Sequence, residues 1–112
     1  MNTINIADDF TPYPGGRYPE DGKGNGTDFR QRFLVPVLQK KDHAIIILDG
    51  ALGYPSSFLE EAFGGLVRLG FNSDVIEASF TIEVDQPGLK RYKSMIIEYI
   101  RKATPTNHQL QP

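Results

Sequence analysis

The sequence predicts a small α/β fold, in which a mixed sheet of about four strands carries helices packed on it. Three observations predict this fold class. Strand-like and helical segments alternate along the chain, residues 44–48 have the composition of a central strand, and a loop then leads into an amphipathic helix at residues 57–69. A chain of 112 residues supports one hydrophobic core, so we expect one domain at residues 1–103 and a disordered polar tail at residues 104–112.

The first part of the chain predicts a strand, an irregular segment and a helix. Residues 3–7 alternate between polar and apolar side chains, as a half-buried strand does. Residues 8–26 are rich in proline and glycine, so we expect turns there and room for a short hairpin. A helix follows with Thr27 as its N-cap and Asp28 at the positive end of its dipole, and Pro36 predicts a kink in it or a later start. Its core-facing residues recur at helical spacing: Phe29, Phe33, Leu34, Val37 and Leu38.

The middle of the chain contains the strongest strand and helix signals. Residues 44–48 are apolar throughout, which predicts a central strand covered on both faces. Residues 57–69 carry an apolar stripe at helical spacing, and Gly70 follows as a C-terminal stop. Gly64 and Gly65 each cost such a helix about 1 kcal/mol relative to alanine. They therefore predict a close approach of a neighbouring backbone or a break in the helix.

The last part of the chain predicts a half-exposed strand and an amphipathic helix. Apolar and polar side chains alternate over residues 78–84, and the Gln-Pro-Gly sequence of residues 86–88 is a turn signal. A helix is expected over residues 89–103. Basic residues in this segment predict either the solvated face of a helix or a docking surface for an acidic protein: Lys90, Arg91, Lys93, Arg101 and Lys102.

Composition and charge exclude several classes of protein. The chain has no cysteine, and its two histidines, His43 and His108, lack metal-ligand spacing, so we expect no disulfide, metal or other cofactor. The net charge of −2 argues against a nucleic-acid binder. The longest apolar run is too short to cross a bilayer, and the N-terminus lacks the features of a signal peptide. We therefore expect a cytoplasmic protein that does not act on membranes or nucleic acid.

Ser56 and Ser57 stand where a strand, loop and helix bring polar residues to the carboxyl edge of a sheet, a common place for binding sites. Ser57 and Glu60 fit the S-x-x-E capping box, which is a structural role. The alternative role is phosphorylation, because a phosphate at a helix N-terminus gains from free N–H groups and the helix dipole. The surrounding sequence is not G-x-S-x-G and neither histidine offers an obvious base, so we expect neither serine to be a catalytic nucleophile.

The glycine-rich segment of residues 14–30 is a second candidate site. Glycine amides and basic side chains are suited to binding an anion, such as a nucleotide or another phosphate ester, which would make the domain a ligand sensor. The alternative is an ordered surface loop, because the segment matches neither the Walker A pattern nor G-x-G-x-x-G. The residues of the candidate anion site are Gly15, Gly16, Arg17, Lys23 and Arg30.

Further candidate residues surround the serines. Asp49 closes the central strand, where it either caps a loop by accepting hydrogen bonds from nearby amides or contacts a partner. Tyr13, Tyr18 and Tyr54 fall in loops, where they either anchor a partner or fold back over the core. The expected partner-binding surface contains Asp49, Tyr54, Glu60 and Glu61.

The strand–Asp–Ser-Ser–helix order, ILDG followed by SSFLEEAFGGL, is similar to that of STAS domains, which are found in anti-sigma-factor antagonists and sulfate-transporter tails. The chain resembles more closely a bacterial STAS-like family of unknown function. This resemblance covers residues 4 to about 100 and rests on PGGRY at 14–18, DG at 21–22, FR at 29–30 and SSFLEEAFGG at 56–65.

The resemblance implies a STAS-like sheet-and-helix fold, a regulatory role through protein–protein interaction, and no enzymatic activity. In anti-sigma-factor antagonists a serine at the helix start is phosphorylated by a partner kinase of the histidine-kinase-like ATPase type, and the complex then dissociates. By position, Ser56 or Ser57 would be that serine and Asp49 the acid at the strand end. The chain departs from the antagonists at residues 50–55, which lengthen the loop between the acid and the serines.

Overall fold

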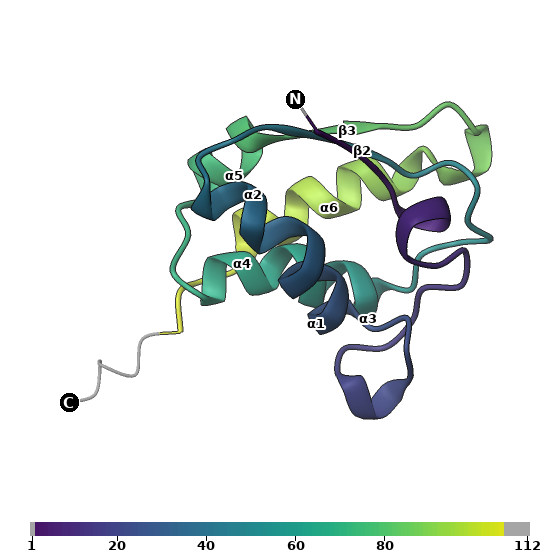
Figure 1. Ribbon diagram of the computed structural model, residues 1–112, viewed down its shortest axis with the longest axis horizontal. Helices are drawn as coiled ribbons and strands as arrows, with labels where there is room; N and C mark the ends of the chain where they lie inside the picture. The colour runs from purple at the N-terminus through teal and green to yellow at the C-terminus, as the bar shows by residue number, and fades with distance from the viewer. Residues whose placement is uncertain (1, 107–112) are drawn as a thin grey trace.

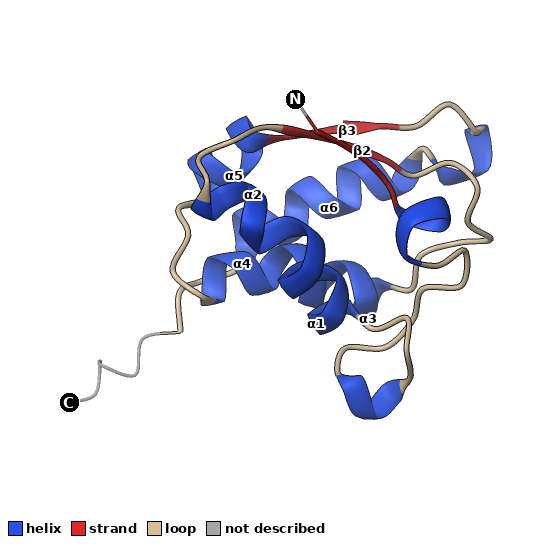
Figure 2. Ribbon diagram, in the orientation of Figure 1, coloured by secondary structure: helices blue, strands red, loops and turns tan. Residues whose placement is uncertain are grey.

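The computed structural model describes residues 2–106 and has two layers, a sheet and a layer of helices. Within this range the sheet has three parallel strands in the order β1–β2–β3, formed by Asn2–Asn5, Ala44–Ile47 and Phe80–Glu83. The register places Ile46 of β2 between Ile4 and Ile82 of its neighbours. The helices gather on one face of the sheet (Figure 1, Figure 2).

The sheet differs from the expected one in strand number, direction and covering. The sequence predicts about four strands in a mixed sheet, whereas the described residues form three strands that are all parallel. The α/β class is confirmed. Ala44 and Ile46 are buried against the helices, but Ile45 and Ile47 on the other face are only half-buried. The central strand is therefore covered on one face, because the helices that follow the strands all return to the same side.

Residues 8–26 add no strand to the sheet, because backbone hydrogen bonds within the segment close it into a loop. β1 is short since Ile6–Phe10 form a π-helical turn directly after it. Further along, the N–H of Gly15 donates to the carbonyl of Gly24 at 2.9 Å, and the N–H of Gly26 donates to the carbonyl of Gly16 at 3.0 Å. Both pairs advance in the same direction along the chain, so the two segments are not the antiparallel arms of a hairpin. The result is a closed surface loop.

The first long helical segment consists of α1, a π-helical turn and α2, at Gly26–Phe29, Arg30–Leu34 and Val35–Gln39. It begins earlier than predicted, because Asn25 rather than Thr27 is the N-cap and its side chain accepts from the N–H of Asp28. Pro36 does not delay the start of the helix. The residue before Pro36 donates its N–H to Arg30, five residues earlier, so a wider turn precedes the proline.

The second long helical segment consists of α3, a π-helical turn and α4, at Ser56–Leu59, Glu60–Gly64 and Gly65–Arg68. It confirms the helix predicted over residues 57–69. It starts one residue earlier because Pro55 is the N-cap, whose carbonyl accepts from the N–H of Phe58 at 3.1 Å. In place of a break at the glycines there is a wide turn, in which Gly65 donates its N–H to the carbonyl of Glu60.

Two further helices flank β3. α5 (Ser73–Ser79) begins after the N-cap Asn72 and takes the first residues of the predicted strand 78–84. The sequence does not reveal α5, because so short a helix shows too few turns for its periodicity to stand out. α6 (Arg91–Lys102) follows a 3-10 turn at Pro87–Leu89 and confirms the predicted last helix.

Aromatic side chains form the centre of the core beneath the sheet. Phe29 of α1 and Phe58 of α3 are fully buried, and their ring centroids lie 5.8 Å apart. Phe10 from the turn after β1 lies 5.3 Å from Phe29 between ring centroids. Tyr54 meets Tyr92 of α6 edge-on at 5.4 Å, which extends the cluster to the last helix. The aromatic cluster therefore holds four separate parts of the chain against one another: the turn after β1, α1, the start of α3 with the loop before it, and α6.

The described part of the chain ends beside α4, where the N–H of Thr106 donates to the carbonyl of Arg68 at 3.2 Å. The remainder of the predicted tail, which includes His108, lies outside the described residues. Between residues 2 and 106, no helix has both the length and the apolar character needed to cross a membrane.

The N-cap of α1 provides the first testable prediction. Asn25 is fully buried and its side chain also donates to the carbonyl of Gly22 at 2.7 Å, so Asn25→Ala leaves buried polar groups without partners. We expect it to lower the free energy of unfolding by about 2 kcal/mol in urea denaturation. Asn72→Ala is the matched control, because Asn72 is an exposed N-cap, and we expect a loss of about 0.5–1 kcal/mol. Equal losses from the two variants would contradict the structural role of Asn25.

Candidate functional site

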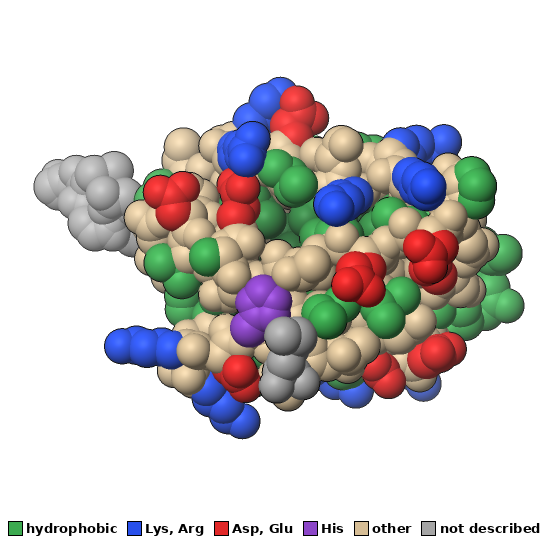
Figure 3. All heavy atoms as spheres, turned by 90° about the horizontal axis from the view of Figure 1, so that it is seen from above, with side chains coloured by type: hydrophobic (Ala, Val, Ile, Leu, Met, Phe, Trp, Pro, Cys, Tyr) green, Lys and Arg blue, Asp and Glu red, His purple; other side chains and the backbone are tan. Residues whose placement is uncertain are grey.

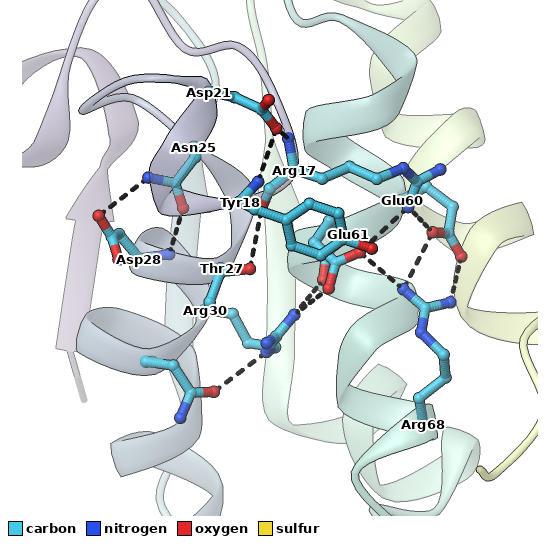
Figure 4. Close-up of polar contacts among 11 residues, drawn as sticks. Arg17, Tyr18, Asp21, Asn25, Thr27, Asp28, Arg30, Glu60, Glu61 and Arg68 are labelled. Atoms are coloured by element: carbon cyan, nitrogen blue, oxygen red, sulfur yellow. Dashed lines mark hydrogen bonds and ion pairs between the residues drawn. The ribbon is translucent and has the colours of Figure 1, made fainter.

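Three arginines and two glutamates form an ion-pair network between the glycine-rich loop and the helix that follows the serines (Figure 4). Arg17 Nη1 lies 2.5 Å from Glu60 Oε1 and 3.1 Å from Glu61 Oε1. Arg68 contacts the same two carboxylates, with Nη1 2.7 Å from Glu60 Oε2. Arg30 Nη1 lies 2.9 Å from Glu61 Oε2. With three positive and two negative charges, the five side chains carry a formal net charge of +1.

Arg30 and Glu61 form the buried part of the network. Each side chain is only 9% accessible, and Arg30 Nη1 also donates to the backbone carbonyl of Glu61 at 2.7 Å. The guanidinium fits because Gly65 has no side chain, since a β-carbon there would collide with Arg30 Nη1. A β-carbon at Gly26 would lie 2.7 Å from the carbonyl oxygen of Phe58, so α1 also packs closely on α3. A close approach does occur at Gly65, but it is made by a side chain, so the predicted approach of a neighbouring backbone is wrong at this position.

The network holds Glu60 in its charged form. Hydrogen bonds from Arg68 lower the pKa of Glu60, burial opposes this effect, and the hydrogen bond from Arg17 adds to the lowering. The same contacts raise the pKa of Arg17 and of Arg68, with the hydrogen bond to Glu60 as the largest cause in each case. The ion pairs are therefore fully formed at neutral pH.

The predicted anion site is filled by groups of the chain itself. Arg17 and Arg30 direct their guanidinium groups at glutamates, so neither faces an open cradle. The carboxylate of Asp21 accepts from the backbone N–H groups of Arg17 and Tyr18, at 3.0 and 2.9 Å. Gly15 donates its N–H to the same loop, as described above, and Gly16 has a φ of +83°, which permits the turn. Only Lys23, which is exposed, keeps its charge away from this network.

Ser56 and Ser57 form the first turn of α3. Ser56 is exposed and Ser57 is half-buried. The capping box predicted for Ser57 is wrong, because Pro55 takes the N-cap position and Glu60 turns to the arginines instead of to the helix start. Within residues 2–106, neither hydroxyl makes a hydrogen bond. Both hydroxyls are therefore free of the structural role that the sequence assigns to Ser57.

Asp49 and Tyr54 have structural roles. The Asp49 carboxylate accepts from the backbone N–H groups of Asp85 and Gln86, with the shortest bond 2.8 Å, so it caps the loop after β3. Tyr54 is only 2% exposed and donates its hydroxyl to the carbonyl of Leu48 at 2.7 Å. Burial raises the pKa of Tyr54, with a smaller contribution from the Asp49 charge. Tyr54 therefore belongs to the core, which corrects its assignment to the partner-binding surface.

Exposed apolar residues lie next to Ser56. Tyr13 is 70% exposed and Leu52 is 82% exposed. Both line a surface depression of 470 Å³ together with Pro12, Pro14 and Pro55. Pro55 directly precedes Ser56, so this apolar surface and the helix start are neighbours. We refer to the depression as the proline surface. Tyr18, the other tyrosine considered as an anchor, is 49% exposed in the glycine-rich loop.

Sequence reasoning missed Arg68 as a member of the site. The signal was present, because Arg68 follows Glu61 by seven residues, which places both on the same side of a helix two turns apart.

Among the described residues, no group of three or more His, Asp or Glu side chains could hold a metal ion. His43, directly before β2, contacts the carbonyl of Ala78 in α5 and the Oγ1 of Thr81 in β3, so it links the start of β2 to both elements.

A sequence model of the family described as STAS-like domain of unknown function (DUF4325) matches residues 25–87. The chain belongs to this STAS-like family. The resemblance stated above is thereby confirmed, and the matched part contains Arg30, Glu61, Gly65 and both serines, whereas Arg17 precedes it. No curated protein and no solved structure matches the chain significantly.

The Gly65 contact can be tested by substitution. Alanine at this position would place a β-carbon against the Arg30 guanidinium, which is held by Glu61 on its other side. We expect Gly65→Ala to lower the free energy of unfolding by about 2 kcal/mol, although alanine has the better helix propensity by about 1 kcal/mol. Gly88→Ala is the control, because nothing lies within 4 Å of a β-carbon there. A Gly65→Ala domain as stable as the Gly88→Ala domain in urea would refute the contact.

The pH dependence of stability tests the ion pairs of Glu60. Its folded-state pKa lies below the ordinary value of 4.5, so the stabilisation is present above that value and is lost as the pH falls through the folded-state pKa. We expect the thermal midpoint of the wild type to fall more steeply between about pH 5 and about pH 3 than that of Glu60→Gln. Glu20→Gln, at an exposed residue of the 3-10 turn Pro19–Asp21 that is not part of the ion-pair network, should keep the wild-type slope. Parallel curves for wild type and Glu60→Gln would show that these pairs do not stabilise the fold.

Proposed function

We propose that this domain is a non-enzymatic regulatory module of the cytoplasm, which docks on a protein partner through the start of α3 and the proline surface. Phosphorylation of Ser56 or Ser57 would release that partner. The observation that carries the proposal is the state of the two serines. Their hydroxyls take part in no cap or hydrogen bond within residues 2–106, and they stand at the edge of an exposed apolar surface.

The proline surface has the composition of an anchor site. Its exposed residues, Tyr13 and Leu52, combine large apolar area with a backbone stiffened by neighbouring prolines. Stiff aromatic and aliphatic groups lose little conformational entropy when a partner covers them, which favours binding. The surface beneath them is fixed, because Tyr54 and Tyr92 pack against each other and the Tyr54 hydroxyl is bonded to the strand end.

A phosphate on either serine would change this surface electrostatically. Phosphorylation adds nearly two negative charges, which are costly to bury against an apolar partner. Ser57 also precedes Glu60 by three residues and therefore shares its side of the helix. A phosphate at Ser57 would repel the Glu60 carboxylate and compete with it for Arg17, which is 37% accessible. Either effect would weaken a complex formed by the unmodified domain.

The class of partner is proposed from the family resemblance. Anti-sigma-factor antagonists are modified by a serine kinase of the histidine-kinase-like ATPase type, and this chain keeps the serine pair at the corresponding helix start. We therefore propose such an ATPase as the partner. The lengthened loop of residues 50–55 carries Leu52 outward, so it would form part of the contact with that partner.

Serine variants test the proposed switch. Ser56→Ala and Ser57→Ala should capture the same partner as the wild type when tagged protein is purified from its own host, because they remove only a hydroxyl. Ser56→Glu or Ser57→Glu should reduce the captured amount about tenfold, since each adds a negative charge at the contact. Captured proteins are quantified by mass spectrometry, and the same samples are mapped for phosphopeptides.

Control substitutions separate the docking surface from general surface effects. Leu52→Arg should abolish capture, whereas Leu69→Arg, at a residue 54% exposed beyond α4, should leave it unchanged. Equal capture by all serine variants would eliminate the switch. Equal capture by Leu52→Arg and the wild type would eliminate the proline surface as the docking site.

A further inference from the structure

The edge strand β3 and helix α6 enclose two adjoining hollows that lie apart from the proline surface. The first hollow has a volume of 230 Å³ and is lined mainly by apolar side chains from α5, β3 and α6. Ile76 and Ile96 in its wall are fully buried, so the hollow reaches into the core. Figure 3, which looks onto the sheet, shows a hollow lined by hydrophobic side chains and flanked by charged ones.

The second hollow continues the first along the strand. It has a volume of 390 Å³, and Ile82 and Lys93 line both hollows. Phe80 and Ile82 border the first hollow, whereas Ile82 and Val84 border the second. The hollows are therefore offset by two residues of β3, or about 7 Å along an extended chain. Side chains two residues apart on an added strand have the same spacing.

The free edge of β3 can accept such a strand. The N–H of Leu48 donates to the carbonyl of Glu83, so Glu83 directs its backbone groups at β2. Because these directions alternate along a strand, Ile82 points its N–H and carbonyl away from the sheet. In the part of the chain that the structure describes, these two groups have no hydrogen-bond partner. A backbone N–H and carbonyl that lack partners at a sheet edge are a template for another strand.

The charged side chains that border the second hollow favour an acidic partner. Phe80 and Ile82 face the core, so Glu83, one residue further, turns to the opposite face of the sheet. The second hollow is bordered by Lys93 of α6 and by Lys90, which directly precedes that helix. Its lining also contains two acids, Asp85 beyond the end of β3 and Glu83, whose side chain lies on the opposite face. Neither lysine has an ion-pair partner within residues 2–106. A carboxylate placed beside the two lysines would supply the ion-pair partner that neither has within residues 2–106.

We propose that an extended segment of an acidic partner protein adds to β3 as a further strand. The segment places a large apolar side chain in the first hollow and a carboxylate side chain, two residues away, beside Lys90 and Lys93. Backbone hydrogen bonds to Ile82 supply affinity, and the two hollows supply the sequence preference. This surface is separate from the proposed serine-controlled contact and does not depend on it.

Selection of random short peptides on the immobilised full-length chain tests the proposal. The enriched peptides should share a large aliphatic or aromatic residue and an Asp or Glu separated by one position, in either order along the peptide. Absence of enrichment over a bare support would overturn the proposal. So would an enriched sequence without this spacing.

The charge of Lys93 provides the matched control. Lys93→Glu should weaken binding of a selected peptide about tenfold in fluorescence anisotropy, because the carboxylate then meets a negative charge. The same peptide with lysine in place of its acid should bind Lys93→Glu better than it binds the wild type. Lys40→Glu, at the exposed end of α2, should leave the affinity of the original peptide unchanged. Equal affinity of the original peptide for Lys93→Glu and the wild type would contradict the proposed site.

Discussion

The buried ion pair of Arg30 and Glu61 is the contact on which the arrangement of the helices depends. A charge removed from water needs a partner in good geometry, and loss of one partner from such a pair costs about 3–5 kcal/mol. Both side chains are 9% accessible, and the pair fits only because Gly65 leaves room for the guanidinium. Gly26 of α1 also permits close packing, because a β-carbon there would collide with the carbonyl oxygen of Phe58 in α3. The spacing of α1 from α3 follows from these contacts, and with it the place of the serines and of Arg17.

The one-sided covering of the sheet determines which surfaces are available for interaction. The helices occupy one face, and β3 is the last strand in the sheet order, so it keeps an open edge with α6 beside it. α6 also reaches the proline surface, since Tyr92 lines it while Lys93, the next residue, lines the hollows at β3. The two proposed contacts therefore lie on different sides of one helix. A partner on either side would meet a surface backed by the same aromatic and aliphatic core.

The hydrophobic pattern of the sequence predicted well those elements whose secondary structure depends mainly on their own residues. The apolar stripe of residues 57–69 and the apolar run beginning at Ala44 predicted the main helix and the central strand, because periodicity reports the side that faces a core. Helix ends were less predictable. Asn25 is the N-cap instead of Thr27 because its amide also bonds to the carbonyl of Gly22, and Pro55 displaced Ser57 because its carbonyl starts the helix. Both choices depend on how the preceding loop folds.

The sequence by itself determined the order of the elements other than α5, the STAS-like family, and the serine pair at the start of the main helix. Only the tertiary structure decided what the charged and aromatic side chains of the predicted sites contact. Arg17 pairs with Glu60, 43 residues away, and Arg30 pairs with Glu61, 31 residues away, so the predicted anion site became an internal ion-pair network. Tyr54 entered the core for the same reason. Spacing along the chain indicates which face of its own element a residue occupies, whereas its partner depends on how separate elements pack.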